Sequence, residues 1–460
     1  MVNRLAGWRG HDVDMSDPRR RARVIDALRS GVVPATGCTE PVSLAFAAAR
    51  AARLLPVAVE RIEGLVSANV MKNGMAVMVP GTEMPGLQVA AALGAIDGDP
   101  DAGLGVLNGA GAAGVGRARA MVSEGLVSVG VADVPDQLYA EVVLHGAGHS
   151  ARVCIAGGHT HVFLEELDGA VVWETARPSP SHTSPATELL RTLTLREVYE
   201  IATTAPSEQI DFMLEAERMN RELVEAGLAG HYGLDLGATM MRAASAGLGS
   251  DDLTTRMTAL TAAASDARMG GAPLPAMTNA GSGNQGITAT VPVTMAADHV
   301  GATDEQRIRA LTLSHLTALY IHASLPVLSA FCAAATAGMG SAAGVAYLLD
   351  GRYETVERAV STMCGDTVGM VCDGAAPSCT LKVASSVGSA SRAVVLALAE
   401  QRVDGSNGIV CDDVDETIRG LGRLATTSSV ATDPQILQIM LGKTRREPGA
   451  TTQGGGAWSG

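Results

Sequence analysis

The pattern of apolar and polar positions divides the chain into two unlike parts. In the first part, β-branched residues alternate with polar ones over short stretches, which is typical of strands that are half-buried in a sheet. After about residue 193, apolar residues recur with helical spacing in almost every segment. The sequence therefore predicts an α+β domain with an antiparallel sheet, followed by an all-α domain. Strands are expected at 57–70, 75–79, 138–145, 150–155 and 160–165, and helices at 18–29, 41–55, 87–96 and 112–124.

Composition sets the expected limits of the domains. Residues 175–184 are rich in proline and serine, as linkers often are, and the end of the chain is rich in glycine and threonine. We therefore expect an N-terminal extension at 1–17, an α+β domain at 18–175, a linker at 176–192, an all-α domain at 193–442 and a flexible tail at 443–460.

Charge and composition narrow the class of function. The 460 residues carry a formal net charge of −14, so nucleic acid is not an expected partner. The first residues are polar, and no secretory signal is expected. Seven cysteines, an odd number, favour the reducing cytoplasm over a disulfide framework. The apolar segment 310–349 contains histidine, proline and many small residues, which favours a buried helix pair over a membrane span.

Two cysteines flank a short loop in the second half. Cys372 and Cys379 stand on either side of Gly374 and Pro377, which prevent a regular helix between them. Such a loop turns N–H groups inward, where thiolate sulfur accepts hydrogen bonds, as an iron–sulfur cluster requires. Cys332 lies in an apolar run upstream. The alternative is that all three cysteines are buried as small hydrophobic residues.

Cys38 is expected at the N-terminus of a helix. Thr39 or a neighbour is a suitable cap, and Pro41 suits the first helical turn. The positive end of the helix dipole would lower the pKa of this thiol and favour bound anions. A packing role is the alternative, although a glycine precedes Cys38 and polar residues follow it.

Other polar residues have two interpretations each. Asn73, between Lys72 and a glycine, is typical of a hairpin turn, and we weigh that role equally with substrate binding. His159 and His161 would share one strand face and supply only two metal ligands, so sheet-edge histidines are favoured over a zinc site. His159 stays a candidate for the active site.

The segment 279–286 is expected to form an anion-binding loop. It contains three glycines and four amide or hydroxyl side chains, so its backbone N–H groups are free to approach a ligand. It lacks the Gly-Lys-Ser/Thr of a phosphate-binding loop and the preceding strand of a dinucleotide fingerprint. A small carboxylate suits its size better than a nucleotide.

Five motifs in order resemble the L-cysteine desulfidase family, which is related to the alpha subunit of iron–sulfur L-serine dehydratases. The resemblance covers residues from about 24 to 441. It rests on Gly37-Cys38-Thr39-Glu40-Pro41, on 71–74 with 79–82, on 280–286, on 372–375 and on 378–382.

The resemblance implies a [4Fe–4S] cluster held by three cysteines, with one iron open. Cys332, Cys372 and Cys379 match the ligands of the serine dehydratase relatives, which places the cluster cysteines in the all-α domain. Cys38 matches a further desulfidase cysteine and is an alternative ligand. The implied reaction is β-elimination from L-cysteine to give sulfide, pyruvate and ammonia.

Three alternatives remain open. The chain could be an iron–sulfur L-serine dehydratase, a lyase for another β-substituted amino acid, or a non-catalytic, cluster-bearing redox sensor. The expected partner is a small amino acid, without nucleic acid or membrane, and a homo-oligomer is left open.

The resemblance leaves the general base unnamed. Lys72, His159 and Cys38 are the candidates for it. The residues expected to bind substrate are Thr39, Glu40, Asn73, Ser282, Gly283, Asn284, Gln285 and His322.

The sequence departs from the family at several positions. His322 stands where lysine is usual, a nearby Gly-Arg is missing, and Ala334 and Ala376 replace other residues. If His322 takes the place of the lysine, it carries charge only near or below its reference pKa of about 6.5. Substrate binding is then expected to weaken between about pH 6 and pH 8.

Overall fold

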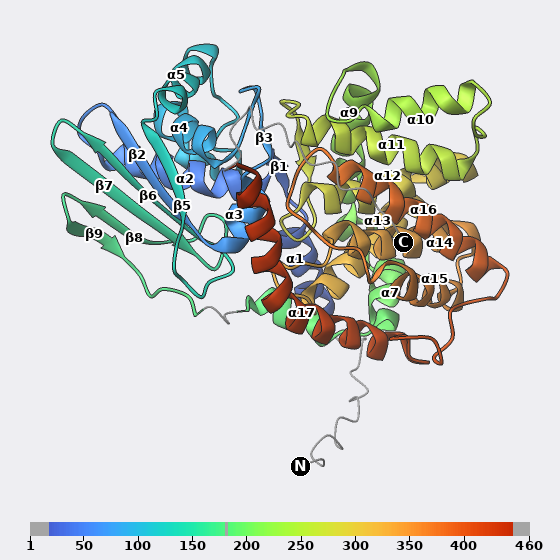
Figure 1. Ribbon diagram of the computed structural model, residues 1–460. Helices are drawn as coiled ribbons and strands as arrows, with labels where there is room; N and C mark the ends of the chain where they lie inside the picture. Colours follow the sequence, from blue (N-terminus) through green and yellow to red (C-terminus); the bar gives the residue numbers. More distant parts are fainter. Residues whose placement is uncertain (1–17, 180–182, 445–460) are drawn as a thin grey trace, which may run out of the picture.

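The computed structural model describes residues 18–179 and 183–444. A sheet with its covering helices forms one half of the molecule, and a helical bundle forms the other (Figure 1). The expected N-terminal extension, nearly all of the expected tail, and residues 180–182 of the expected linker lie outside the described residues. The limits of the independent folding units therefore stay a prediction.

The main sheet has six strands in the order β5-β2-β6-β7-β8-β9. Three of its strands confirm the predicted positions to within about two residues, and β5 and β9 were not predicted. The bounds are β2 Arg61–Val66, β5 Val127–Val131, β6 Tyr139–Gly146, β7 His149–Ala156, β8 Val162–Leu167 and β9 Ala170–Glu174.

The prediction of a purely antiparallel sheet is wrong, because β2 and β5 pair in parallel. All other neighbouring strands of this sheet are antiparallel. Between β2 and β5 the chain makes a long helical crossover, which is the kind of connection that parallel strands require. The crossover contains α3 Ala68–Gly74, α4 Leu87–Asp97, a 3₁₀ helix at Pro100–Gly105 and α5 Ala112–Ser123. The sheet is therefore mixed.

The predicted hairpin at Lys72 and Asn73 is also wrong. Both residues lie in α3, which Ser67 caps by accepting a hydrogen bond from the backbone N–H of Val70 at 3.4 Å. The strand before it ends at Val66. The cap satisfies an N–H group that a hairpin would have paired across strands, so the chain turns into a helix here. The short strands β3 Met78–Val79 and β4 Met84–Pro85 pair only with each other.

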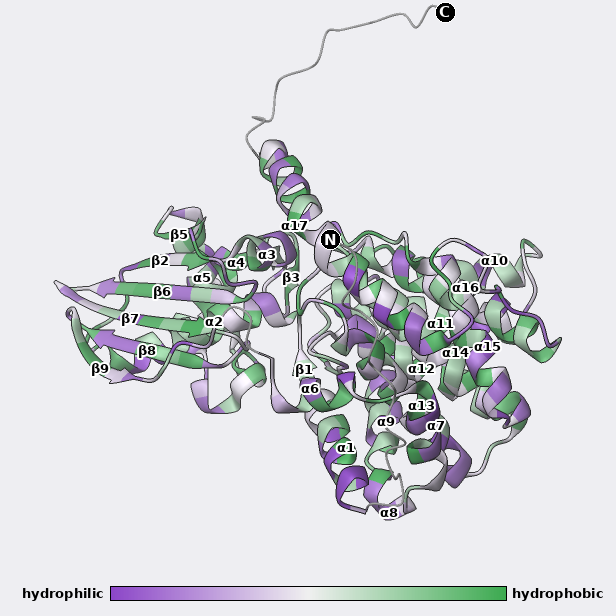
Figure 2. Ribbon diagram, turned by 90° about the horizontal axis from the view of Figure 1, so that it is seen from below, coloured by the Kyte–Doolittle hydropathy of each residue, from purple (hydrophilic) through white to green (hydrophobic). Residues whose placement is uncertain are grey.

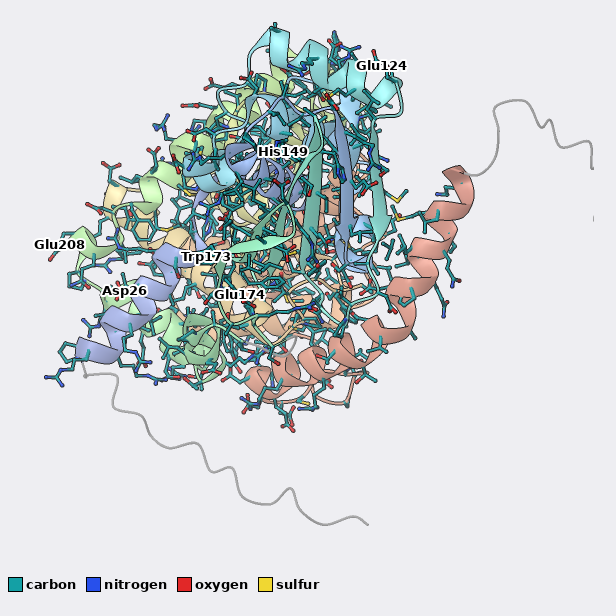
Figure 3. All side chains as sticks on the ribbon, turned by 90° about the vertical axis from the view of Figure 1, so that its left-hand side faces the viewer. Asp26, Glu124, His149, Trp173, Glu174 and Glu208 are labelled. Carbon is teal, nitrogen blue, oxygen red and sulfur yellow. The ribbon has the colours of Figure 1, made fainter. Side chains whose placement is uncertain are left out.

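Helices α2 Thr39–Leu54 and α4 pack on the sheet and on each other. Their contact depends on Gly94, because a Cβ atom there would lie 2.2 Å from the carbonyl oxygen of Ala45. The two helices therefore touch backbone to backbone. At the far edge of the sheet, β9 is exposed along its whole length, and Figure 3 shows Trp173 and Glu174 on this side.

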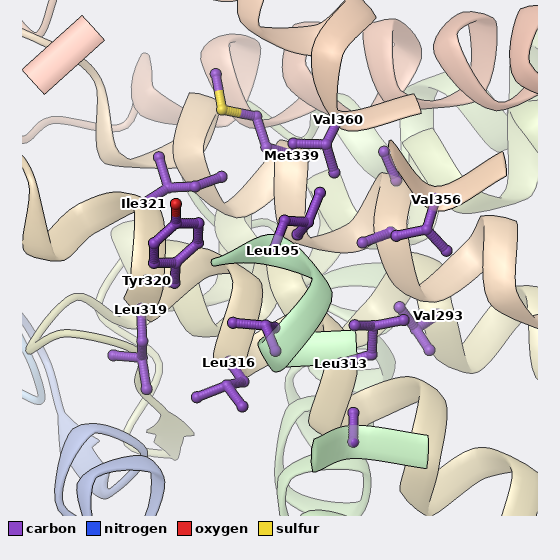
Figure 4. Close-up of a cluster of buried hydrophobic side chains, with 14 of the residues drawn as sticks. Leu195, Val293, Leu313, Leu316, Leu319, Tyr320, Ile321, Met339, Val356 and Val360 are labelled. Carbon is purple, nitrogen blue, oxygen red and sulfur yellow. The ribbon is translucent and has the colours of Figure 1, made fainter. Parts of the chain in front are cut away.

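The helical half contains α6 to α16. Their bounds are α6 Pro185–Arg191, α7 Leu195–Thr204, α8 Ser207–Ile210, α9 Met213–Ala229, α10 Leu236–Ser245, α11 Leu253–Met269, α12 Gly283–Val300, α13 Asp304–Ala323, α14 Ala333–Asp350, α15 Tyr353–Thr367 and α16 Cys379–Leu398. The inward faces of α12, α13, α14 and α15 supply much of the core (Figure 4). Hydrophobic and hydrophilic residues mix along these helices (Figure 2).

Two segments connect the halves. Helix α1 Pro18–Gly31 precedes the sheet in sequence, but its Val24 and Leu28 belong to the core of the helical half. The following β1 Pro34–Thr36 pairs with β10 Pro275–Met277 of that half. Helix α17 Val414–Thr444 leaves the helical half and ends against the sheet half, where Leu437 joins the core (Figure 1).

Among the described residues, one helix is long and apolar enough to cross a membrane. It is α16, and half of its most apolar window is buried. A core helix can meet the same length and hydropathy criteria, so this is weak evidence for a membrane span.

We expect Gly94→Ala to destabilise the protein by about 1–3 kcal/mol, because the new methyl group overlaps the backbone of α2. Gly116→Ala, on the exposed face of α5, is the matched control, since no atom lies within 4 Å of its added Cβ. It should stabilise by about 0.5–1 kcal/mol. Urea unfolding of both variants measures the difference. Equal stabilities would contradict the contact between α2 and α4.

Candidate functional site

One cavity lies between the two halves and collects most of the residues singled out from the sequence. We call it the thiol cavity, and its volume is about 120 Å³. Of the candidate residues, those that line it are Cys38, Thr39, Glu40, Asn73, His159, Ser282, Asn284, His322, Cys332, Cys372 and Cys379. Gly283 and Gln285 lie beside the lining, and Lys72 lies behind it. Cys154, Cys364 and Cys411 are not in the lining.

Cys332 and Cys372 are held together by a short antiparallel bridge between Phe331 and Val371. The backbone N–H of Cys332 donates to Met370 at 3.0 Å, and that of Cys372 donates to Ala330 at 2.7 Å. Because neighbouring residues alternate across an extended chain, the two cysteines follow their bridge residues onto the same face. The pairing brings together two thiols that are 40 positions apart.

Three of the four cavity thiols stand at helix N-termini. Cys38 is the N-cap residue of α2, Cys332 is the N-cap residue of α14, and Cys379 is the first residue of α16. The N-terminus of a helix carries partial positive charge and unpaired N–H groups. This arrangement favours anionic sulfur, and it confirms the sequence-based placement of Cys38.

Burial opposes ionisation of these thiols. It raises the pKa of Cys332 to about 12, with further contributions from Cys372 and Cys379. It raises the pKa of Cys379 to about 11, with contributions from Cys372 and Cys38. The thiols are thus close enough to repel one another as anions, and a cation shared among them would relieve that repulsion.

Four thiols in one cavity are donors of the kind that an iron–sulfur cluster uses. Within 18–179 and 183–444, no three His, Cys, Asp or Glu side chains are grouped as ligands of one metal ion. A cluster binds each thiolate to a different iron, so its ligands need not meet at one point. Several thiols spread around one cavity are consistent with that requirement.

Arg268 lines the same cavity and was not found from the sequence. It lies in the last turn of α11, is 6% exposed, and donates from Nη2 to the carbonyl oxygen of Gly37 at 3.1 Å. Burial raises the pKa of the Cys38 thiol, although Arg268 acts to lower it, so the expectation of a lowered pKa at this helix N-terminus is wrong. The sequence feature that could have identified Arg268 is an arginine within a run of small residues, since such a run is typical of a buried helix.

Thr39, Glu40 and Asn73 form a chain of hydrogen bonds on one wall. Asn73 Nδ2 donates to Glu40 Oε1 at 3.0 Å, and Thr39 Oγ1 donates to the carbonyl oxygen of Gly281 at 3.0 Å. Glu40 has no cationic partner among the described residues. A buried carboxylate in this state favours a ligand that carries positive charge.

Two histidines line the cavity, and each has a buried nitrogen atom without a hydrogen-bond partner. His159 lies in the turn between β7 and β8 rather than on a strand as expected, and its buried Nε2 has no partner. Burial lowers its pKa, and nearby Glu40 acts in the opposite direction. His322 Nδ1 is also buried and unpartnered, and burial lowers the pKa of this residue to about 4.

The expectation that His322 carries charge between pH 6 and 8 is therefore wrong. A histidine with a pKa of about 4 is neutral throughout that range. In this range its side chain can act as a neutral hydrogen-bond donor or acceptor.

The loop at 279–286 opens into α12. Its shape is fixed from behind, because Asn279 Nδ2 donates to the carbonyl oxygen of His315 at 3.0 Å and Gln285 Nε2 donates to Asn279 Oδ1 at 2.8 Å. Gln285 is thus part of the support of the loop, although its Oε1 has no partner. Ser282 caps α12 and lines the cavity.

Lys72 supports the cysteine loop from behind. Its ammonium group contacts Asp433 Oδ1 at 2.7 Å and donates to the carbonyl oxygen of Cys372 at 3.3 Å. The side chains of Lys72 and Asp433 are 1% and 10% exposed. Because Asp433 lies on α17, this pair ties both halves to the loop that carries Cys372.

A second cleft adjoins the thiol cavity. The two share His322, Val327 and Ala280 in their linings. This cleft also includes His161 and Gly157 from the turn that carries His159. The shared residues mark the boundary between the inner cavity and the outer cleft.

Comparisons with known proteins identify the family of this chain. The family model described as serine dehydratase alpha chain matches residues 149–438. The chain belongs to this family. Three relatives are UPF0597 proteins. The protein of Cutibacterium acnes is 58% identical over 76% of this chain and 99% of its own length. The protein of Yersinia enterocolitica is 51% identical over 91% of this chain and 96% of its own length, and YhaM of Escherichia coli K12 is 49% identical over 92% of this chain and 98% of its own length. Membership of the serine dehydratase alpha chain family supports the resemblance found in the motifs and suggests a lyase.

We expect Lys72→Met to destabilise the protein by about 3–5 kcal/mol, because it leaves Asp433 buried without its partner. Lys72→Met combined with Asp433→Leu should recover part of this loss. Urea unfolding of the single and double variants gives the interaction free energy between Lys72 and Asp433. If Lys72→Met kept the stability of the wild type and lost only turnover, Lys72 would instead be the general base.

We expect His322→Gln to leave the pH dependence of substrate binding unchanged between pH 6 and 8, because His322 is already neutral there. The measurement is kcat/KM for both proteins at half-unit intervals of pH. A ratio of wild type to variant that falls as pH rises would restore the charged role for His322.

Proposed function

We propose that the chain is a carbon–sulfur lyase that uses a [4Fe–4S] cluster to eliminate the β-substituent of L-cysteine, giving sulfide, pyruvate and ammonia. The observation that carries this proposal is that four thiols and several unpartnered polar atoms line one buried cavity. Cys332, Cys372 and Cys379 are the proposed ligands, and Cys38 is the alternative to one of them. The proposed location is the cytoplasm, where free thiols stay reduced.

When bound, the cluster supplies an iron with a free coordination position, which acts as a Lewis acid toward the departing group. The rest of the chemistry belongs to the chain. Burial of the cavity limits the access of water and strengthens the electrostatic contacts of a bound amino acid. Glu40, a carboxylate without a cationic partner, is proposed to hold the substrate ammonium group.

His159 is the proposed general base. Its Nε2 is free, lies in the cavity lining and belongs to a ring whose pKa burial lowers, so it is neutral and able to accept the α-proton. Lys72 fits this role less well, because its ammonium group is committed to Asp433 and to backbone carbonyls. Cys38 fits less well because burial raises the pKa of its thiol.

An L-serine dehydratase is the second candidate. The description of the family that matches the chain favours it. The motif at Cys38, which resembles that of the desulfidases, favours L-cysteine instead. The two reactions share a carbon skeleton and differ in the leaving group, so the ratio of kcat/KM for the two substrates distinguishes them.

The proposal is tested by anaerobic reconstitution with iron and sulfide. Wild type should bind a cluster and release sulfide and pyruvate from L-cysteine faster than it releases pyruvate from L-serine. Cys372→Ala should lose most of its iron and its turnover. Cys364→Ala is the matched control, because Cys364 is buried in the helical core against Met339 and should keep both. Equal iron content in the two variants would contradict the cluster assignment.

A separate variant tests the base. His159→Gln should keep the iron content of the wild type and lower kcat at least about a hundredfold, as removal of a general base commonly does. Exchange of the α-proton of L-alanine with solvent deuterium, followed by NMR, should fall in parallel. Unchanged exchange would assign proton transfer to another residue.

A further inference from the structure

Arg268 is a buried cation without an anionic partner. Its residue is 6% exposed, and it forms no ion pair within the described parts of the chain. Nη2 donates to the carbonyl oxygen of Gly37 at 3.1 Å, and Nη1 contacts the sulfur of Met269 at 3.2 Å. Its Nε is buried and has no acceptor. Burying a guanidinium group in this state is costly unless an anion completes the site.

The free Nε faces the start of α12. A Cβ atom on Gly283 would lie 2.1 Å from Arg268 Nε, so only glycine leaves room here. The N–H groups of Gln285 and Gly286 bond to Ser282. The N–H groups of Gly283 and Asn284 find no acceptor in the hydrogen bonds of the described residues. The N-terminus of this 18-residue helix therefore adds two free donors beside the guanidinium group.

We propose that the guanidinium group of Arg268, which lines the cavity, and the backbone N–H groups of Gly283 and Asn284 form the binding site for the α-carboxylate of the substrate. A guanidinium group and the N-terminus of a helix are both favourable partners of a carboxylate, and together they fix its plane. The site then selects amino acids with a free carboxylate and rejects the corresponding amides, esters and amines. It deepens the proposed function and rests on it only for the identity of the amino acid.

The position of this site gives the substrate a direction. Glu40 lies on the cavity wall that Asn73 and Thr39 form, and Thr39 in turn bonds to Gly281 of the loop before α12. An amino acid with its carboxylate at Arg268 and its ammonium group toward Glu40 presents its side chain to the cysteines of the same cavity. Arg268 is thus a specificity-determining residue for the proposed reaction.

A competing role for Arg268 is to attract the sulfur of Cys38 only. L-alanine and L-alaninamide separate the two roles, because they share the side chain and the ammonium group and differ in the carboxylate. Neither has a β-substituent that can leave, so calorimetry on the reconstituted full chain measures binding without turnover.

We expect wild type to bind L-alanine at least about tenfold more tightly than L-alaninamide. Arg268→Gln should abolish this preference, and Arg268→Lys should keep part of it. Gly283→Ala keeps the arginine but fills the space beside Nε, and should also reduce it. Arg307→Lys is the matched control, because Arg307 is a largely buried arginine that is paired with Glu217 and Asp298 away from the cavity.

Three results would overturn the proposal. They are a wild type that does not prefer L-alanine, an Arg268→Gln variant that folds and keeps the preference of the wild type, and a loss in Arg268→Gln that is equal for both ligands. The last result would assign Arg268 to Cys38. Thermal unfolding of each variant identifies those that do not fold. If Arg268→Gln does not fold, the preference of Gly283→Ala for L-alanine over L-alaninamide tests the proposal instead. A wild type that prefers L-alanine but releases no sulfide or pyruvate would contradict the lyase and leave the carboxylate site standing.

Discussion

The site depends on the convergence of helix N-termini at one buried cavity. Helices α2, α14 and α16 bring Cys38, Cys332 and Cys379 at their first residues or caps, and α12 brings the loop that ends at Ser282. Each N-terminus adds partial positive charge and unpaired N–H groups. Arg268 adds a full charge to the same place. A cavity of this kind is unfavourable when empty of anions, and thiolates and a carboxylate are the anions that its chemistry suits.

The rest of the fold keeps that convergence in place. Asn279 and His315 fix the loop before α12 from behind, and the pair of Lys72 and Asp433 fixes the loop that carries Cys372. Both supports use buried polar groups whose partners come from other elements, and such groups are costly to separate. Helix α17 takes part because Asp433 lies on it, so the end of the described chain helps to shape a site formed mostly by earlier residues.

Small residues make the close approach of helices possible. The chain is only 3% aromatic, and its helices touch at points such as Gly94, where α4 meets the backbone of α2. Gly283 has the same property at the site, where it leaves the space that Arg268 Nε occupies. Polar groups brought so close to one another in a buried site interact more strongly than they would in water. Burial also removes water from these side chains, which is why it raises the pKa of Cys332 and lowers the pKa of His322.

Local signals and motifs in the sequence were enough to predict the two-part fold, three strands of the sheet, the helix that begins beside Cys38 and many of the residues that line the cavity. These features follow from local periodicity, caps and motifs, which each short segment carries within itself. The parallel pairing of β2 with β5, the helix at Asn73, the lowered pKa of His322 and the position of Arg268 in the cavity lining became visible only in the folded chain. Each depends on which distant segment packs against the residue. At Asn73 the capped helix forms in place of the hairpin that the local sequence favours. At His322 the surrounding residues exclude water, which lowers the pKa of the histidine.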